Sequence, residues 1–339
     1  MMTFFLLFVV LCATTSSVQG FGIAPRIGVT RVAASRARAS LPLQMHHEQT
    51  LVNTILSATK PLAPAAVKNG VVAVAAPVTM ASLLYKTIQP LSGISSVKEA
   101  ALVNLVICSI LYIKKTKSLT TSGLLHATGL GIGLWTFLGW KGWLYCATYL
   151  VLGSLATKVK MGEKENLGIA EKRGGARGPE NVWGSAATGM VCALLTHVIP
   201  CNYCGSLLRL GYVASIATKL SDTLGSEIGK AYGKNCYLIT SLKRVPRGTE
   251  GAVSVEGTVA GIGGSLVLAL VAKALGLIST DIQVVYTIIA AFVATTAESF
   301  IGAVFQDKIP WLTNELVNLI NTFIGASVAI LLAGYKVFV

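Results

Sequence analysis

Residues 217–250 have the sequence ATKLSDTLGSEIGKAYGKNCYLITSLKRVPRGTE, in which acids, glycines and five loop cations stand directly between long apolar runs. An ionised side chain near hydrocarbon is costly, so Asp222 and Glu227, on a predicted helix, indicate a functional site. The loop that follows carries three further cations, Lys243, Arg244 and Arg247. Because carboxylates hold divalent cations and basic groups hold phosphate oxygens, this segment predicts phosphoryl chemistry at a membrane face. The alternative is a helix end followed by a solvated basic loop.

The composition is that of a membrane protein. Hydrophobic residues make up 53% of the 339 residues and charged residues only 12%, with a mean hydropathy of +0.67. This leaves too little polar surface to cover a soluble globule, so we predict an all-α fold, a polytopic membrane helix bundle. The net charge of +14 does not indicate nucleic-acid binding, because aromatic residues do not alternate with the basic ones.

The N-terminal segment has the features of a targeting presequence. Its apolar run over 4–13 is too short to span a bilayer and is followed by small polar residues up to Gly20, which predicts a signal peptide over 1–20. Residues 21–45 contain four Arg among Ser and Ala and no acid, which is transit-peptide composition. Together they resemble the bipartite plastid presequences of algae with secondary plastids, so residues 46–339 are predicted to form a multi-pass domain in a plastid membrane. An ordinary secretory signal with a disordered basic tail is the alternative.

Nine apolar stretches are predicted as membrane helices, taking about 20 residues as one span. They are 66–85, 99–113, 123–139, 142–157, 183–200, 205–229, 253–277, 282–303 and 314–335. If the chain crosses at each, four loops share one side: 114–122, 158–182, 230–252 and 304–313. These carry fifteen Lys and Arg against three in the opposite loops, a strong positive-inside asymmetry. In a plastid that face would be the stroma, where nucleotides are available.

Common nucleotide and metal motifs are not found in the sequence. Residues 225–230 are one residue short of a P-loop, and their Lys230 is followed by Ala instead of Ser or Thr. The glycines of 129–133 lie inside an apolar span, where close helix packing explains them better than a dinucleotide fingerprint. Cys201 and Cys204 form a C-x-x-C turn near His197, but a zinc site would need a fourth ligand that the local sequence lacks.

Three blocks of sequence carry a family resemblance. They read RGGARGPENVWGSAATG over 173–189, SDTLGSEIGKAYGK over 221–234 and VPRGTEGAVSVEGT over 245–258. Through these blocks, residues 66–339 closely resemble the plastid phytyl-phosphate kinases of the tocopherol pathway, part of an integral-membrane family that includes animal transmembrane protein 19. The chain is more distantly similar to CTP-dependent dolichol and phytol kinases. Their pattern of Asp, spaced glycines, a basic residue and Glu-Gly is matched by Asp222, Gly229, Gly233, Lys243, Glu250 and Gly251, with Thr249 where Ser or Thr is usual.

The resemblance implies a reaction and its partners. A phosphoryl group would pass from CTP, or another NTP, to phytyl phosphate, giving phytyl diphosphate for tocopherol and related prenyl-lipid synthesis. The partners are then the nucleotide with Mg²⁺, the lipid substrate and the bilayer. A phosphate monoester has a second pKa near 6, so the acceptor is largely dianionic and needs no strong general base. Catalysis should therefore come from Mg²⁺ and from Lys or Arg side chains that neutralise the two anions and hold them in line.

The acidic helix offers one polar face. Asp222, Ser226, Gly229 and Gly233 are spaced by four, three and four residues, so on a helix they share a face against which a phosphate chain could lie. Glycines at this spacing could equally let another helix approach, and both roles are compatible. Asp222 and Glu227 are five residues apart and would share one ion only if the helix unwinds. Asp222 is therefore the first candidate for Mg²⁺, with Glu227 as the other metal candidate.

Basic residues are divided between the two substrates. We expect the nucleotide to be held by the loop after the acidic helix, through Lys243, Arg244, Arg247 and the amides near Gly248 and Gly251. Lys172, Arg173 and Arg177 are predicted to meet the lipid phosphate. The Gly-rich run around them could instead form a flexible basic loop on anionic lipid.

A second polar cluster lies near the C-terminus. In the related kinases an intramembrane Glu followed by an Asn-bearing segment forms part of the site, and Glu298 with Asn314 resembles that pair. Glu298 is therefore predicted as the second catalytic acid, beside Asp222. Asn318 and Asn321 share the helical face of Asn314, and we expect them to tie helices together, because polar groups within hydrocarbon must find partners.

Two classes of function are compatible with these features. A transporter or flippase for a phosphorylated lipid or metabolite would also need intramembrane acids and a basic mouth. An enzyme should gather its charged groups at the membrane face where soluble nucleotide arrives, whereas a carrier should place them at mid-depth between inverted repeats. The sequence has no detectable repeat and favours the enzyme. A non-catalytic scaffold would leave the dense polar block unexplained.

Overall fold

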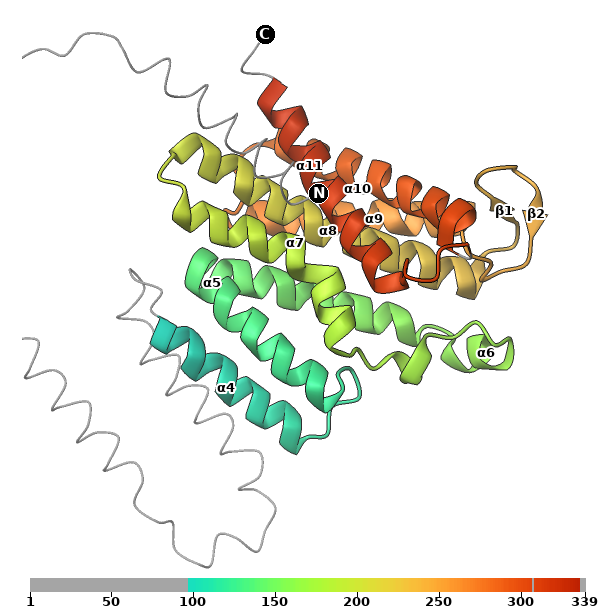
Figure 1. The fold of residues 1–339 in the computed structure, drawn as a ribbon, viewed down its shortest axis with the longest axis horizontal. Coiled ribbons are helices and arrows are strands. Elements are labelled where there is room, and N and C mark those ends of the chain that lie inside the picture. Colours follow the sequence, from blue (N-terminus) through green and yellow to red (C-terminus); the bar gives the residue numbers. More distant parts are fainter. Residues whose placement is uncertain (1–96, 307, 336–339) are drawn as a thin grey trace, which may run out of the picture. The chain divides into compact units, whose positions relative to one another are not determined.

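The computed structural model describes residues 97–306 and 308–335. The presequence predicted over 1–20 and 21–45, and the helix predicted over 66–85, lie outside these residues. The described chain is mainly helical, as Figure 1 shows. Its α-helices are α4 (Val97–Ile113), α5 (Thr121–Lys158), α6 (Met161–Asn166), α7 (Pro179–Val198), α8 (Asn202–Tyr232), α9 (Val255–Ala274), α10 (Asp281–Ile301) and α11 (Asn314–Tyr335). A tight turn, η4 (Lys172–Gly175), precedes α7, and a π-helical segment, η5 (Gly302–Gln306), extends α10.

The helices match the predicted apolar stretches. The ranges 123–139 and 142–157 become the two limbs of α5, which changes direction at Gly139, where φ is 71°. Glycine adopts this left-handed conformation without a steric penalty, so it can break a long helix in two. Within the described residues, three segments are long and apolar enough to cross a membrane by length and composition: Val255–Ala274, Asp281–Gln306 and Asn314–Tyr335. The predicted total of nine spans is therefore not confirmed.

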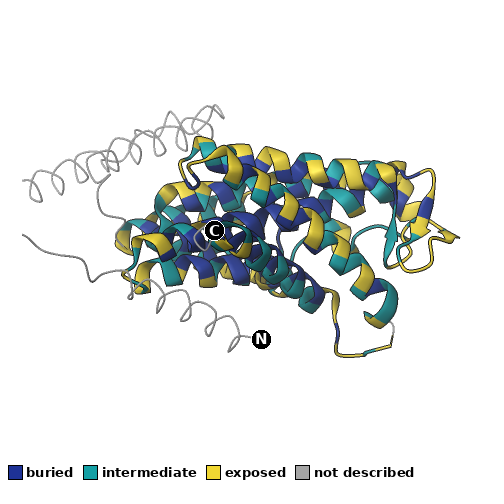
Figure 2. Ribbon diagram, turned by 90° about the horizontal axis from the view of Figure 1, so that it is seen from above, coloured by how far each residue is buried: buried dark blue, intermediate teal, exposed yellow. Residues whose placement is uncertain are grey.

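Helix α8 lies at the centre of the bundle and explains part of that difference. It packs against α5, α7, α9, α10 and α11, and nearly every residue from Leu207 to Leu220 is buried. Figure 2 shows the same distribution, with buried residues between the helices and exposed ones on the outer faces. A helix enclosed by other helices needs no lipid-facing apolar surface. The side chains of α8 can therefore be polar where the interior of the bundle offers partners.

Glycines bring α8 and α9 into backbone contact. A side chain at Gly257 of α9 would place its Cβ 2.5 Å from the carbonyl oxygen of Gly225, and one at Gly261 would lie 2.9 Å from that of Ser221. Neither helix could approach this closely with larger residues. The spaced glycines of α8 thus allow close helix packing, which is one of the two roles predicted for them.

A small antiparallel sheet that was not predicted interrupts the otherwise helical chain. Strands β1 (Cys236–Leu238), β2 (Arg244–Val245) and β3 (Ala252–Val253) are arranged in the order β2-β1-β3. Cys236 pairs with Val245, and Tyr237 pairs with both Arg244 and Val253. The strands have only two or three residues each, too short for an alternating apolar pattern to reveal them in the sequence. We call residues 236–253 the basic hairpin segment.

The four loops predicted to share one side meet at one end of the bundle. Leu119 forms a β-bridge with Arg177, and the Arg247 guanidinium lies 3.2 Å from the Glu163 carboxylate. Gly251 lies against the backbone of Ser299 and Ala303, at the end of α10. These contacts join 114–122, 158–182 and 230–252, and the last of these loops meets the end of α10 directly before 304–313. That this end of the bundle lies on one side of a membrane stays a prediction.

Candidate functional site

A cavity of about 790 Å³ lies at this loop end. Its walls are the C-terminal half of α8, the segment 168–177, residues 248–254 and the facing ends of α10 and α11. The volume falls within the range of about 300–1,000 Å³ typical of small-molecule sites. A small-molecule ligand in this cavity would therefore meet side chains that belong to otherwise buried helices.

Most of the predicted site residues line this cavity. They are Lys172, Arg173, Arg177, Asp222, Ser226, Glu227, Gly229, Gly248, Thr249, Glu250, Gly251, Glu298 and Asn314. Four predicted residues do not line it: Gly233, Lys243, Arg244 and Arg247. The structure thus unites the three sequence blocks but leaves out all three cations predicted to hold the nucleotide.

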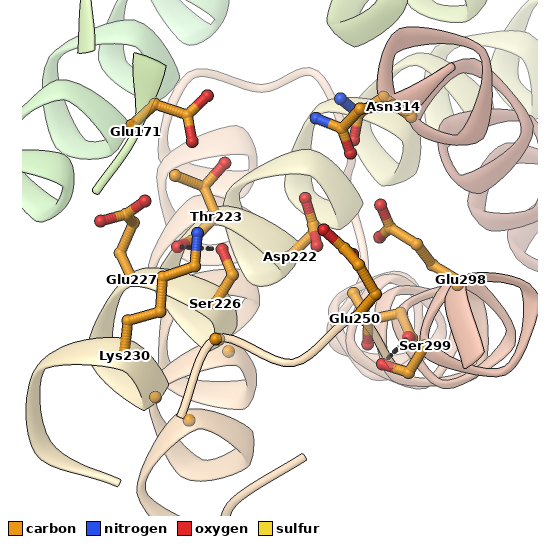
Figure 3. A pocket seen from close by; sticks show the side chains of 18 of the residues that line it. Glu171, Asp222, Thr223, Ser226, Glu227, Lys230, Glu250, Glu298, Ser299 and Asn314 are labelled. Atoms are coloured by element: carbon orange, nitrogen blue, oxygen red, sulfur yellow. Dashed lines mark hydrogen bonds between the residues drawn. The ribbon is translucent and has the colours of Figure 1, made fainter. Parts of the chain in front are cut away.

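Three acids from different elements converge in the cavity. In Figure 3, Asp222 of α8, Glu298 of α10 and Glu250 of the basic hairpin segment extend toward one another. The carboxyl groups of Asp222 and Glu298 lie side by side, and the charge of Glu250 acts on Glu298. Crowded carboxylates repel each other, so the arrangement favours a proton shared between them or a compensating cation.

Lys219 supplies part of that compensation. Its ammonium group is ion-paired with the Asp222 carboxylate one turn along α8, and it donates a 2.6 Å hydrogen bond to Asn318 of α11. Asn321 donates a hydrogen bond to Glu298. Asn318 and Asn321 therefore tie α11 to α8 and α10, as predicted, and in doing so they orient the two acids.

Gly251 determines where Glu250 lies. Its φ is 72°, a left-handed conformation, and an added Cβ would lie 2.6 Å from both the Ala303 nitrogen and the Ser299 carbonyl oxygen. Only glycine satisfies both conditions at low cost. The close approach of the hairpin backbone to the end of α10 places the neighbouring Glu250 beside Glu298.

The acids fit a magnesium ion that takes only one or two of its ligands from the protein. No group of three or more His, Cys, Asp or Glu in the described part of the chain is arranged to hold a metal ion by itself. Mg²⁺ in phosphoryl-transfer sites is commonly bound by only one or two carboxylates, with substrate phosphates and water completing its oxygen ligands. The adjacent Asp222 and Glu298 carboxylates match that donor set.

Glu227 belongs to a different contact. Its carboxylate forms an ion pair with Lys164 of α6, and the side chains of the two residues are only 4% and 0% exposed. Lys164 also donates a 2.7 Å hydrogen bond to the carbonyl oxygen of Thr157. Figure 3 places Glu227 apart from the three converging acids, so the structure does not bring it to Asp222.

The two predicted arginines of the 158–182 loop have different partners. Arg173 is ion-paired with Glu180 and donates a 2.9 Å hydrogen bond to Asn181. Arg177 donates a 2.8 Å hydrogen bond to the Tyr149 hydroxyl and lies over the Tyr149 ring. Within 97–306 and 308–335, no carboxylate lies within ion-pair distance of Arg177. Its positive charge is thus available to an anion in the cavity.

The cations of the basic hairpin segment point elsewhere. Lys243 and Arg244 are exposed, and Arg247 donates to the carbonyl oxygens of Lys230 and Ala231 as well as to Glu163. Arg247 therefore caps the C-terminal end of α8, where a positive charge is favourable. Hydrogen bonding to Lys160, reinforced by Lys160 and Arg247 charge, lowers the pKa of Glu163.

Two lysines in the cavity were not predicted. Lys219 and Lys230 both lie on α8 and line the cavity, and Figure 3 places Lys230 beside Ser226 and Glu227. A signal for Lys219 was present, because an ionisable residue within an apolar helix is itself unusual. Lys230 was counted only as a loop cation, since the predicted helix ended at residue 229.

Comparisons with known proteins place the chain in a family. The model of the family described as integral membrane protein DUF92 matches residues 104–326. The chain belongs to this integral membrane family. It is 53% identical over 232 residues to an uncharacterized membrane protein of Synechocystis, covering 68% of this chain and 89% of that protein. No solved structure matches the chain.

Two further relatives come from a plant and an archaeon. The chain is 50% identical over 217 residues to protein VTE6, chloroplastic, of Arabidopsis thaliana, covering 63% of this chain and 65% of that protein. It thus spans slightly less than two thirds of this relative's length. An uncharacterized membrane protein of Methanocaldococcus jannaschii is 32% identical over 230 residues, covering 67% of the chain and 92% of the relative.

Proposed function

We propose that this protein is a prenyl-phosphate kinase that transfers a phosphoryl group from CTP, or another NTP, to phytyl phosphate. The observation that carries the proposal is the distribution of charge in the 790 Å³ cavity. The paired Asp222 and Glu298 carboxylates occupy one part of its wall, while Arg177 and Lys230 contribute positive charge elsewhere. A site that joins two anions needs both features.

The residues divide into two groups in this proposal. Asp222 and Glu298 would hold Mg²⁺, with Glu250 beside them, and the bound ion would neutralise phosphate charge. Lys230, the Ser226 hydroxyl and the amides around Gly248 and Gly251 line the same cavity and would hold the nucleotide phosphates. Lys219 keeps Asp222 in position through their ion pair.

Arg177 is the proposed anchor for the acceptor. Its planar guanidinium can bind two phosphate oxygens, and Tyr149 fixes its orientation through a hydrogen bond and a cation–π contact. The acceptor is already dianionic near neutral pH, so an oxygen of phytyl phosphate can attack the terminal phosphorus of the nucleotide directly. The bond from that phosphorus to the bridging oxygen breaks, and a nucleoside diphosphate leaves.

The cellular setting follows from relatives and from sequence. One relative is chloroplastic, which supports a plastid membrane as the location of this chain. The predicted bipartite presequence would then direct it to a secondary plastid. Its product, phytyl diphosphate, would serve tocopherol and related prenyl-lipid synthesis. A cavity at one end of the bundle, beside the four loops, favours an enzyme that meets soluble nucleotide over a carrier.

The direct test is a radiolabel assay of the purified protein in lipid vesicles. Phytyl phosphate is supplied with CTP, ATP, GTP or UTP labelled at the terminal phosphate, and the lipid product is separated and identified. We expect labelled phytyl diphosphate with at least one nucleotide, and loss of product with Asp222→Asn. Absence of product with every nucleotide would reject the kinase proposal, and full turnover by Asp222→Asn would reject the role of that acid.

A transport assay separates the other class of function. Vesicles with enclosed labelled phytyl phosphate, or with an enclosed nucleotide, are followed for release in the presence of the protein. We expect no release beyond that of vesicles holding the Asp222→Asn variant. Release without a diphosphate product would favour the transporter.

A further inference from the structure

A second, smaller cavity adjoins the proposed active site. It has a volume of about 130 Å³ and lies among α4, both limbs of α5 and α7. Four of its lining residues also line the large cavity: Tyr149, Arg177, Asn181 and Ser185. The two spaces therefore share a wall in which Arg177 is the positive group.

The interior of the small cavity is apolar. Away from the shared wall its lining is mostly Leu, Ile, Ala and Cys side chains. The few polar groups there are already satisfied: Trp143 donates a 2.9 Å hydrogen bond to Asn104, whose amide donates to Ala100, and Thr128 donates to Leu124. A ligand in this space would meet no polar group that needs a partner, so a hydrocarbon chain fits it.

The two ends of the small cavity differ in character. Trp143 precedes Tyr149 by six residues on the second limb of α5, which corresponds to about 9 Å along the helix. Tyr149 and Arg177 mark the end near the loops, where Arg177 pairs in a β-bridge with Leu119, and Trp143 marks the end farther into the bundle. A molecule with a phosphate at one end and a hydrocarbon chain at the other matches this order.

We propose that the small cavity binds the part of the prenyl chain next to the phosphate, with Arg177 holding that phosphate at the shared wall. This inference rests on the proposed function and identifies the lipid subsite of the same active site. At about 130 Å³ the cavity is smaller than the pockets of about 300–1,000 Å³ that enclose whole ligands. Only the first units of a long chain therefore lie inside, and the remainder extends into the bilayer.

Chain-length preference tests the subsite. Ala147 lines the small cavity but not the large one, so Ala147→Phe fills the lipid subsite and leaves the acids untouched. Val151, on the same helix, is 57% exposed and lines neither cavity, so Val151→Phe is the matched control. We expect Ala147→Phe to lower kcat/KM for phytyl phosphate by about ten- to 100-fold, the usual effect of a misfitted hydrophobic pocket. With dimethylallyl phosphate, whose short chain needs less room, the loss should be clearly smaller, and Val151→Phe should match wild type.

A photolabel keeps the inference falsifiable if Ala147→Phe fails to fold or the protein is not a kinase. Phytyl phosphate with a diazirine in its first isoprene unit is irradiated with wild-type protein in vesicles, and the adduct is mapped by mass spectrometry. We expect adducts in the small cavity, on residues such as Cys108, Leu124 or Cys146, and displacement by phytyl phosphate but not by phytol. Adducts on outward faces only, or equal displacement by phytol, would overturn the subsite. Adducts in the cavity without any diphosphate product would instead retain the subsite and reject the kinase.

Discussion

The charged face of α8 and the basic hairpin segment follow one another in the chain, yet only α8 contributes cations to the cavity. Lys219, Asp222, Ser226 and Lys230 of α8 all line it, whereas Lys243, Arg244 and Arg247 do not. The difference shows that charge density along a sequence does not locate a binding site. A regular helix repeats its side-chain directions, so a polar face on α8 stays a polar face after folding.

The hairpin cations are directed by contacts that lie outside their own segment. Arg247 turns back to the carbonyl oxygens at the end of α8 and to Glu163 of α6. The contribution of this segment to the cavity comes instead from its backbone and from Glu250, placed by the close contact of Gly251 with α10. Acids of α8 and of the basic hairpin segment thus meet in one cavity, whereas the cations of α8 line it and those of the hairpin do not.

The largest effect is expected when one lysine of α8 and one lysine of the basic hairpin segment are each replaced. Lys219→Met removes the ion-pair partner of Asp222. We expect kcat to fall by about 10²–10³-fold, as when a preorganised electrostatic partner is lost. Lys243→Met, the matched control on the exposed hairpin, should change kcat by about twofold or less. A loss confined to Lys243→Met would mean that the hairpin closes over the nucleotide, and the comparison would fail.

Lys164 and Glu163, which are adjacent on α6, can be substituted to compare how α8 and the basic hairpin segment are each attached to α6. Lys164 forms a buried ion pair with Glu227 of α8, and Glu163 forms an exposed one with Arg247 of the basic hairpin segment. Lys164→Met leaves a buried carboxylate without its partner, so we expect a loss of about 3–5 kcal/mol in unfolding free energy. Glu163→Gln should leave the denaturation midpoint in detergent unchanged. The double variant Lys164→Met/Glu227→Leu should recover much of the loss, and failure to recover would mean that Lys164 acts through packing alone.

Alanine substitutions at two glycines with the same backbone conformation distinguish the cost of backbone strain from the effect of moving Glu250. Gly251 and Gly276 have φ values of 72° and 73°, but only Gly251 packs against the α10 backbone. Alanine at either position should cost about 1–2 kcal/mol of stability from the left-handed conformation. Only Gly251→Ala should also displace Glu250 and lower kcat/KM for the nucleotide. Equal activity of the two variants would show that the position of Glu250 does not matter.

Acidic pH should loosen the hairpin attachment, the smallest of these effects. The pKa of Glu163 is lowered mainly by Lys160 and further by Arg247, so the contact of Glu163 with Arg247 holds the hairpin fully above the usual Glu pKa of 4.5. That contribution is lost as the pH falls through the lower folded-state pKa. We expect hydrogen exchange of the hairpin amides to accelerate below this range, relative to Glu163→Gln at the same pH. Identical exchange in both proteins would mean that the pair does not hold the hairpin.

The sequence predicted much of the site because three of its parts have local signals. Asp222 and Glu298 are ionisable residues within apolar helices, and Glu250-Gly251 lies in a block with a family resemblance. Lys219 had the same local signal but was overlooked, whereas the partner of Glu227 had none, because Lys164 lies 63 residues earlier in the chain. Pairings of that separation follow from packing, which periodicity does not encode.

Composition and apolar periodicity by themselves determined that this chain is a membrane protein built mainly of helices, because burying apolar side chains depends on local pattern. The positions of seven of the eight α-helices in the described residues follow from the same pattern, and the exception is α6, which lies in the predicted loop 158–182. Only the tertiary structure decided which charges share the cavity, since that depends on how α6, the basic hairpin segment and α10 pack around α8. The apolar space beside Arg177 likewise exists only where α4, α5 and α7 meet.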